Sequence, residues 1–256
     1  MYIAHMNHLE VSEYLKNRDT VLIPVGSLEN HGLHMPLGTD FLIPDKIAAL
    51  INEKSPILIA PTLNYGATDD LNGFPGTVSI GTEGLIQLLK AICDGLYQYG
   101  FRHFLILNGH GGNTAAIQAV GMHLYRKGAY LANLNWWLMA WDLNPAWKGG
   151  HGGAEETAGV LAVDPSLVDW DALDEMNLHN DVTENIKRTN FKTVEYKGVP
   201  IVICRKVTRF TNNGWVGADH PKDATIEWGT EMLQTTADYI ADFLEELKKA
   251  PIDAAR

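Results

Sequence analysis

The sequence contains little cysteine. Its 256 residues include only Cys93 and Cys204, so at most one disulfide could form and a disulfide-stabilised scaffold is excluded. Sparse cysteine usage is typical of a reducing compartment, and we expect a cytoplasmic protein. Both cysteines lie among apolar residues, LKAICDGL and PIVICRK, which predicts that both are small core side chains.

Long apolar runs and clusters of basic residues are also missing. No uninterrupted apolar run approaches the roughly 18 residues that cross a bilayer. The first residues, MYIAHMNHLEV, lack the basic and then apolar order of a secretory signal. With 31 acidic against 20 basic side chains the formal net charge is -11, which disfavours contact with nucleic-acid phosphates. We therefore expect neither a membrane nor a nucleic acid as a partner.

Apolar residues are plentiful, in short runs. They make up 46% of the chain against 20% charged residues, a balance typical of globular proteins. This length favours one large core, so we predict a single domain over residues 1–256. Apolar runs alternate with segments of helical periodicity, which favours a parallel sheet covered by helices. The expected strands are 21–25, 57–63, 103–108 and 129–136, the expected helices are 84–100, 114–128 and 224–248, and 181–215 is expected to hold a hairpin or an extension of the sheet edge.

Three polar or aromatic segments follow directly after these expected strands. SLENHGLH comes after strand 21–25, NGHGGN begins at the end of strand 103–108, and NLNWW closes strand 129–136. Ligand sites of open parallel sheets lie beyond the carboxyl ends of the strands, on the loops that follow them. The sequence therefore predicts that these segments meet at one edge of the sheet.

Four residues of these loops have the chemistry of metal ligands. Glu29 and His31 are two residues apart and project to the same side of an extended segment, while Asp40 follows a loop that can fold back. His110 comes from another strand end and is flanked by glycines that allow a close approach. Two carboxylates and two imidazoles suit zinc, manganese or ferrous iron, and a carboxylate can bridge two such ions. The residues alone leave open a purely structural role for these side chains.

The same segments resemble the creatininase (creatinine amidohydrolase) family. The resemblance is carried by PVGSLENHGLHMPLGTD, FPGT, NGHGGN, HGGAEET and GWVGADHPKDAT, in the family order. It implies a three-layer α/β/α fold with a mostly parallel central sheet. It also implies one or two divalent metal ions per chain, with Glu29, His31, Asp40 and His110 as ligands and Asp40 as the bridging carboxylate.

The resemblance extends to two candidate catalytic residues, His151 and Glu156. His151 matches a family histidine near the substrate, which can shuttle a proton. Creatininase itself has a metal-binding glutamate where this chain has Gly112. Glu156 could reach the second metal in its place, or could be an ordinary acidic residue at a helix start. A further departure lies before FPGT, where many members carry a Glu-His pair and this chain carries Asp70 and Leu71.

Four residues are predicted to bind the substrate. Trp147 and one of Trp136 and Trp137 match substrate-facing tryptophans of creatininase, and aromatic walls suit a flat or ring-shaped ligand. The alternative for each tryptophan is a place in the core. Asn113, the last residue of NGHGGN, is predicted to contact the substrate with them.

The resemblance implies a metal-dependent hydrolase of the amidohydrolase type. Metal ions would lower the pKa of water toward roughly 7 for attack on a carbonyl, and His151 would protonate the leaving group. The favoured substrate is a small ring such as a cyclic amide. A keto-inositol opened at a C-C bond, a formamide, or a non-catalytic metal- or sugar-binding role remain alternatives. The family also implies a homo-oligomer, a hexamer or another even-numbered assembly.

Overall fold

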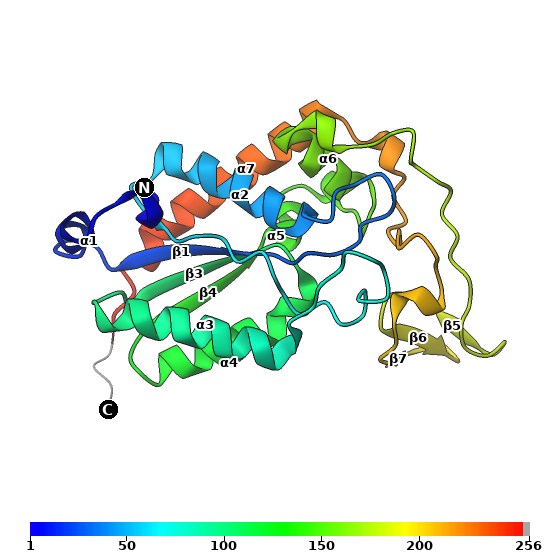
Figure 1. Ribbon diagram of the computed structural model, residues 1–256, viewed down its shortest axis with the longest axis horizontal. Coiled ribbons are helices and arrows are strands. Elements are labelled where there is room, and N and C mark those ends of the chain that lie inside the picture. Colours follow the sequence, from blue (N-terminus) through cyan, green and yellow to red (C-terminus); the bar gives the residue numbers. More distant parts are fainter. Residues whose placement is uncertain (253–256) are drawn as a thin grey trace.

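A four-stranded parallel sheet forms the centre of the computed structural model, which describes residues 1–252 (Figure 1). The strand order is β2-β1-β3-β4. The strands are β1 (Thr20–Val25), β2 (Leu58–Ile59), β3 (His103–Asn108) and β4 (Tyr130–Asn135).

The central strands are buried on both faces. In β1, Leu22 packs into the core on one side of the sheet, and Val21 and Ile23 pack into the core on the other side. Because side chains alternate along a strand, a sheet covered on both faces needs an unbroken apolar run. This confirms the interpretation of VLIPV and HFLILN as buried strands.

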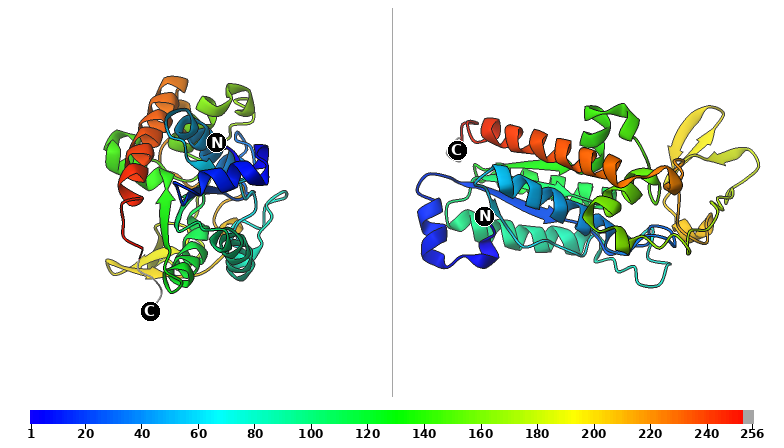
Figure 2. Two further views of the ribbon diagram at one scale, coloured as in Figure 1. Left: turned by 90° about the vertical axis from the view of Figure 1, so that its left-hand side faces the viewer. Right: turned by 90° about the horizontal axis from the view of Figure 1, so that it is seen from above.

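Helices cover both faces of the sheet, which confirms the three-layer α/β/α fold (Figures 1 and 2). No helix within residues 1–252 is both long and apolar enough to cross a membrane. One face carries α2 (Thr39–Lys54), α5 (Trp136–Leu143), α6 (Ala154–Val163) and α7 (Ile226–Leu247), the other carries α3 (Gly81–Gln98) and α4 (Thr114–Tyr125), and α1 (His8–Tyr14) precedes β1. Short 3-10 turns lie at Ile3–His5, Gly111–Asn113, Pro145–Trp147, Pro165–Leu167, Val207–Arg209 and Pro221–Asp223.

The strand expected over 57–63 is reduced to Leu58–Ile59. Pro61, two residues beyond the end of this strand, has no N-H to donate and so interrupts the ladder. Pairing resumes only at Leu63, which donates to the Pro24 carbonyl at 3.0 Å. The expected strand 129–136 ends one residue early, because Trp136 begins α5.

A second sheet lies at the carboxyl-end side of the central strands (Figures 1 and 2). It is antiparallel, in the order β5 (Ile186–Arg188), β6 (Thr193–Tyr196) and β7 (Val199–Val202). Strands β6 and β7 form a hairpin whose two turn residues, Lys197 and Gly198, both have positive φ, the geometry of a type I′ turn. The hairpin prediction is confirmed. The alternative of an extended sheet edge is wrong, because these strands pair only with one another.

The two cysteines differ in burial. Cys93 is fully buried in the core between the sheet, α3 and α4, as predicted. Cys204 is exposed, so its predicted place in the core is wrong. It follows β7, whose own residues Val199–Val202 are all exposed, so the apolar run PIVI does not indicate burial here. The predicted single domain stays a prediction, and residues 253–256 lie outside the described part.

Candidate active site

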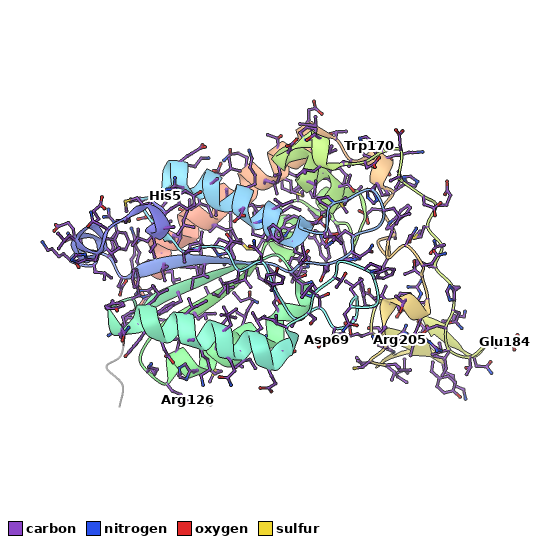
Figure 3. All side chains as sticks on the ribbon, viewed as in Figure 1. His5, Asp69, Arg126, Trp170, Glu184 and Arg205 are labelled. Carbon is purple, nitrogen blue, oxygen red and sulfur yellow. The ribbon has the colours of Figure 1, made fainter. Side chains whose placement is uncertain are left out.

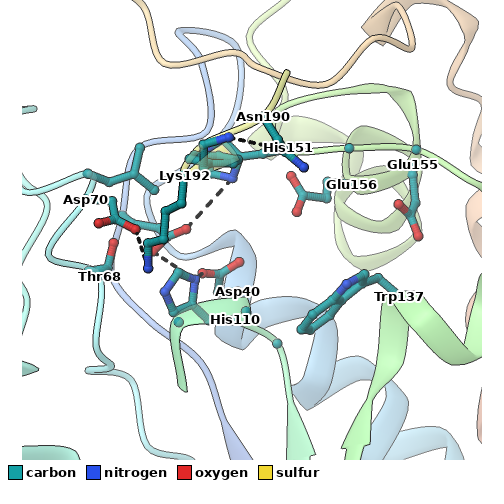
Figure 4. A pocket seen from close by; sticks show the side chains of 18 of the residues that line it. Asp40, Thr68, Asp70, His110, Trp137, His151, Glu155, Glu156, Asn190 and Lys192 are labelled. Carbon is teal, nitrogen blue, oxygen red and sulfur yellow. Dashed lines mark hydrogen bonds and ion pairs between the residues drawn. The ribbon is translucent and has the colours of Figure 1, made fainter. Parts of the chain in front are cut away.

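A cavity of about 450 Å³ lies between the carboxyl ends of the central strands and the small antiparallel sheet (Figure 4). This is the edge of the sheet at which the sequence predicts the polar segments to meet. The cavity is lined by loops after β1, β2 and β3, by α5, by the start of α6 and by the loop that leads into β6.

Glu29 and Asp40 form the carboxylate floor of this cavity. Both side chains are almost fully buried. Glu29 follows β1, and Asp40 lies in the first turn of α2, which the intervening loop brings back to the end of the strand. The hydroxyl of Ser27 lies 2.6 Å from Glu29 Oε2 and 2.9 Å from Asp40 Oδ2. Since its single proton can be donated to only one of them, the pair calls for further positive charge.

Two histidines are oriented toward these carboxylates by backbone carbonyls. His31 Nδ1 lies 3.1 Å from the Glu29 carbonyl, which directs Nε2 at Asp40 Oδ1, 3.0 Å away. His110 Nε2 lies 3.1 Å from the Ala67 carbonyl, and its Nδ1 lies 3.1 Å from both Glu29 Oε2 and Asp40 Oδ2. An imidazole that is anchored through one nitrogen and free at the other is the usual arrangement of a histidine metal ligand.

His151 and Glu156 complete the cluster from the other side. His151 Nε2 lies 2.8 Å from the Asn30 carbonyl, and its Nδ1 faces Glu29 Oε1 at 3.9 Å. Glu156, in the first turn of α6, accepts a hydrogen bond of 2.7 Å from the Gly152 N-H. The same oxygen, Oε2, lies 3.7 Å from His31 Nε2. The structure therefore brings all six predicted metal-binding and catalytic residues into one cluster.

Two glycines of NGHGGN permit this packing. A β-carbon at Gly109 would lie 1.8 Å from the Asp40 carbonyl oxygen, so only glycine lets the first turn of α2 approach the end of β3. A β-carbon at Gly112 would lie 2.1 Å from the Ala67 carbonyl oxygen and 2.4 Å from His110 Nε2. A glutamate at position 112 would therefore displace the contact that orients His110.

The buried carboxylates act on the imidazoles around them. Burial lowers the pKa of His31, but the carboxylates of Asp40 and Glu156 outweigh it and raise that pKa to about 10. Burial likewise opposes a charge on His110, yet Glu29 and Asp40 raise its pKa well above the ordinary value. His151 behaves oppositely, because burial and the charge of His31 lower its pKa to about 3. The floor of the cavity thus attracts positive charge, whereas burial keeps His151 uncharged.

The residues of the cluster fit divalent metal ions. Glu29 Oε1 and His31 Nε2 are fully buried, and neither makes a hydrogen bond of good geometry, although His31 Nε2 lies 3.0 Å from Asp40 Oδ1. A buried polar atom without a well-aligned partner is costly. These side chains form three overlapping groups, and within each group the possible ligand atoms all lie within 4.8 Å of one another. They are Glu29, Asp40 and His110; His31, Asp40 and Glu156; and Glu29, His31 and His151.

The residues predicted to bind the substrate lie in two different places. Trp137 lines the cavity. Trp136 and Trp147 do not line it, because they are buried in the core between the sheet and α7. Asn113 is fully buried and accepts from the Ala67 N-H at 2.9 Å while donating to the Gly26 carbonyl at 3.0 Å. The structure places these three residues in the framework behind the cavity and does not support a substrate contact for them.

Several cavity residues were missed by the sequence analysis. Trp141 lines the wall beside Trp137 and donates to Glu155 Oε1 at 2.6 Å. Burial, with Glu156 next in importance, raises the pKa of Glu155 to about 9, so this acid is neutral at pH 7. Helical spacing from Trp137 to Trp141 could have indicated a shared face. Phe191 and Lys192 come from the loop between β5 and β6, and no local pattern shows that this loop reaches the cavity.

A parallel α/β fold with a buried cluster of carboxylates and imidazoles beyond its strand ends is typical of a hydrolase that uses metal ions. Residues 4–244 match the family described as creatininase, creatinine amidohydrolase. The chain belongs to this family, as the sequence motifs predict.

The chain is similar to curated proteins with different substrates. It is 31% identical over 181 residues to a 3-dehydro-scyllo-inosose hydrolase from Thermotoga maritima, a match that covers 66% of this chain and 58% of that protein. It is 30% identical over 195 residues to creatinine amidohydrolase from Pseudomonas putida, covering 67% of this chain and 75% of that protein. Both names describe hydrolases, but their substrates differ.

Solved structures of creatininase have the same fold. One is 25% identical, covers 96% of each chain and superposes with a TM-score of 0.74. Others include a Zn-Zn form of a creatininase variant and a manganese form, each 25% identical, with TM-scores of 0.72 and 0.73. Creatininase, a relative of this chain, therefore has solved structures with zinc and with manganese.

Proposed function

We propose that this protein is a metal-dependent hydrolase that attacks a carbonyl carbon of a small ring-shaped substrate. The observation that carries this proposal is the position of Asp40, whose Oδ1 faces His31 at 3.0 Å and whose Oδ2 faces His110 at 3.1 Å. One carboxylate thus belongs to two ligand groups, as a bridging ligand must. The related creatininase structures with zinc and with manganese support the choice of these two metals for this site.

The two ligand groups have distinct members. Glu29 and His110 would hold one ion, and His31 and Glu156 would hold the other, with Asp40 shared between them. When bound, divalent ions polarise a carbonyl and bring the pKa of water near neutrality. The backbone carbonyls of Glu29 and Ala67 keep His31 and His110 in the ligating orientation.

His151 would move the proton. Its Nε2 is held by the Asn30 carbonyl at 2.8 Å, so its Nδ1 is the nitrogen that faces the cavity. The His151 ring packs against the rings of His31 and Phe191, with centroid distances of 4.3 Å and 5.0 Å, and these contacts fix its plane. A neutral imidazole at this place can accept a proton from an attacking water at Nδ1 and return it to the leaving atom. Trp137 would offer the substrate ring an apolar face.

Two bonds are candidates for cleavage. A C-N bond of a cyclic amide is supported by similarity to creatinine amidohydrolase. A C-C bond of a keto-inositol ring is supported by similarity to 3-dehydro-scyllo-inosose hydrolase. The assembly expected from the family, a homo-oligomer, and the cytoplasmic location expected from the cysteine content both stay predictions.

A substrate screen tests the proposed function. The full chain, loaded with zinc or manganese, is incubated with lactams, formamides and keto-inositols, and the products are identified by mass spectrometry. Addition of one water to one class of ring, abolished by a chelator and restored by the metal, is the expected result. No turnover of any class by metal-loaded protein would refute hydrolysis of such carbonyl compounds.

A further inference from the structure

The wall of the cavity that faces the metal cluster is polar. It is built from two segments that lie far apart in the sequence: the loop after β2 contributes Thr68 and Asp70, and the loop into β6 contributes Asn190, Lys192 and Thr193. Figure 4 shows Lys192 extending toward Asp70, with Thr68 beside it, across the cavity from Trp137. The sequence analysis noted Asp70 as a departure from the family, and neither the metal cluster nor His151 accounts for it.

Lys192 and Asp70 form an ion pair at this wall. Lys192 Nζ lies 2.8 Å from Asp70 Oδ2, and the two side chains remain 45% and 28% exposed, so a ligand can reach both. Within the described residues, Lys192 is the one lysine or arginine that lines the cavity. The pair is neutral as a whole, yet it offers hydrogen-bond donors and acceptors side by side.

Both ends of the pair are held by backbone contacts. Val207 donates to the Asp70 carbonyl at 2.8 Å, which ties the loop after β2 to the chain that leaves the small sheet. Ile203 donates to the Lys192 carbonyl at 2.6 Å, which continues the β6-β7 hairpin. The rings of Phe191 and His151 pack edge to face with their centroids 5.0 Å apart, so the loop that carries Lys192 packs against the proposed proton carrier. Groups preorganised in this way recognise a ligand at low entropic cost.

We propose that this wall binds adjacent hydroxyl groups of a polyhydroxylated ring. The binding groups are Lys192 and Asp70, with Asn190, Thr68 and Thr193 beside them. This inference rests on the proposed function and selects one of its two substrate classes, the keto-polyol. Adjacent hydroxyls donate to the carboxylate and accept from the ammonium, which matches the pair. An anionic substituent would meet the Asp70 carboxylate, and a small lactam has no hydroxyls to replace the water on these five polar side chains.

Equilibrium binding tests the inference independently of turnover. Zinc-loaded full-length protein is titrated by calorimetry with myo-inositol and with cyclohexanol, which has the same ring size but one hydroxyl. The variants are Lys192→Met and Asp70→Asn, with Lys187→Met as the matched control, because Lys187 is exposed on β5 and outside the cavity. Metal content is measured for each sample.

The expected result is saturable binding of myo-inositol, weakened roughly 10-fold or more by either cavity substitution and within about twofold of wild type in the control. In turnover, Lys192→Met should raise KM for a keto-inositol by a factor similar to its loss of binding, roughly 10-fold. Equal binding of myo-inositol and cyclohexanol, or equal binding by Lys192→Met and wild type, would overturn the inference. So would binding of myo-inositol hexakisphosphate that is tighter than that of myo-inositol and lost in Lys192→Met. Protein that holds metal but hydrolyses no carbonyl compound would refute the proposed function instead.

Discussion

Asp40 Oδ1 and His31 Nε2 lie 3.0 Å apart in the interior of the protein, with both side chains almost fully buried. The second oxygen of Asp40 faces His110 at the same time, 3.1 Å away. A carboxylate that divides its oxygens between two buried imidazoles needs compensating charge between them. Two divalent ions that share Asp40 would explain this geometry, and the predictions below test the proposal residue by residue.

Replacing Asp40 should remove metal and activity together. In Asp40→Ala both proposed ions lose a ligand, and the remaining carboxylates no longer balance two cations. We expect the bound metal per chain, measured by plasma emission, to fall below about a tenth of the wild-type value. Asp45→Ala is the matched control, since Asp45 is exposed on the same helix and should retain metal. A metal-loaded Asp40→Ala enzyme would argue against the bridge.

Glu156 should behave as a ligand of one ion only. Glu156→Gln keeps the shape but weakens coordination, so we expect the loss of about one metal equivalent and of most activity. Glu155→Gln is the internal comparison, because Glu155 is neutral at pH 7 and its neighbour Trp141 can still donate to an amide oxygen. This variant should retain its metal. Full metal content with slow turnover in Glu156→Gln would make Glu156 a substrate or proton contact.

His151 should be needed for turnover and not for metal binding. We expect His151→Ala to keep the metal content of wild type and to lose roughly 10²- to 10⁴-fold in kcat, the usual contribution of a positioned acid or base. His151 Nδ1 also belongs to a ligand group with Glu29 and His31. Loss of metal from His151→Ala would assign it to that group, and unchanged turnover would exclude it as the proton carrier.

Two glycine substitutions separate the site from the general framework. In Gly109→Ala the new β-carbon would meet the Asp40 carbonyl at 1.8 Å, so α2 must shift, and we expect both metal affinity and thermal stability to fall. Gly95→Ala is the contrast, since Gly95 lies in the last turn of α3 and nothing is within 4 Å of the new carbon. It should stabilise the fold by about 0.5–1 kcal/mol, measured by urea unfolding. A stable, fully metal-loaded Gly109→Ala protein would contradict the close packing at Asp40.

The gathering of these side chains at one edge of the sheet could be predicted from the sequence, for a local reason. Glu29, His31 and His110 each lie within a few residues of a strand end, and parallel strands deliver such residues to one edge. The tryptophan that lines the cavity was harder to predict. Trp136 and Trp137 are adjacent at the start of α5, but Trp136 is buried in the core and Trp137 lines the cavity. One residue of register decides which of them reaches the cavity, and no pattern in WWLMAW fixes that register.

The opposite wall of the cavity could not be predicted at all. Lys192 and Asp70 lie in different segments. They meet because the segment that follows the small sheet packs on the loop after β2 through Leu71, Phe74, Val207 and Phe210. The short strands of this sheet are mostly exposed, so their sequence carries no strong burial signal. A contact made by the docking of two such segments depends on tertiary packing, which local periodicity does not encode.

The most direct test of the account is the metal content of the wild-type chain. Protein prepared without chelator, or stripped and reloaded with zinc or manganese, is desalted and analysed by plasma emission against protein concentration. We predict two equivalents per chain, one for each ligand group that shares Asp40. One equivalent would retain the ligand set and contradict the bridge. No bound metal after reconstitution would contradict the central claim itself.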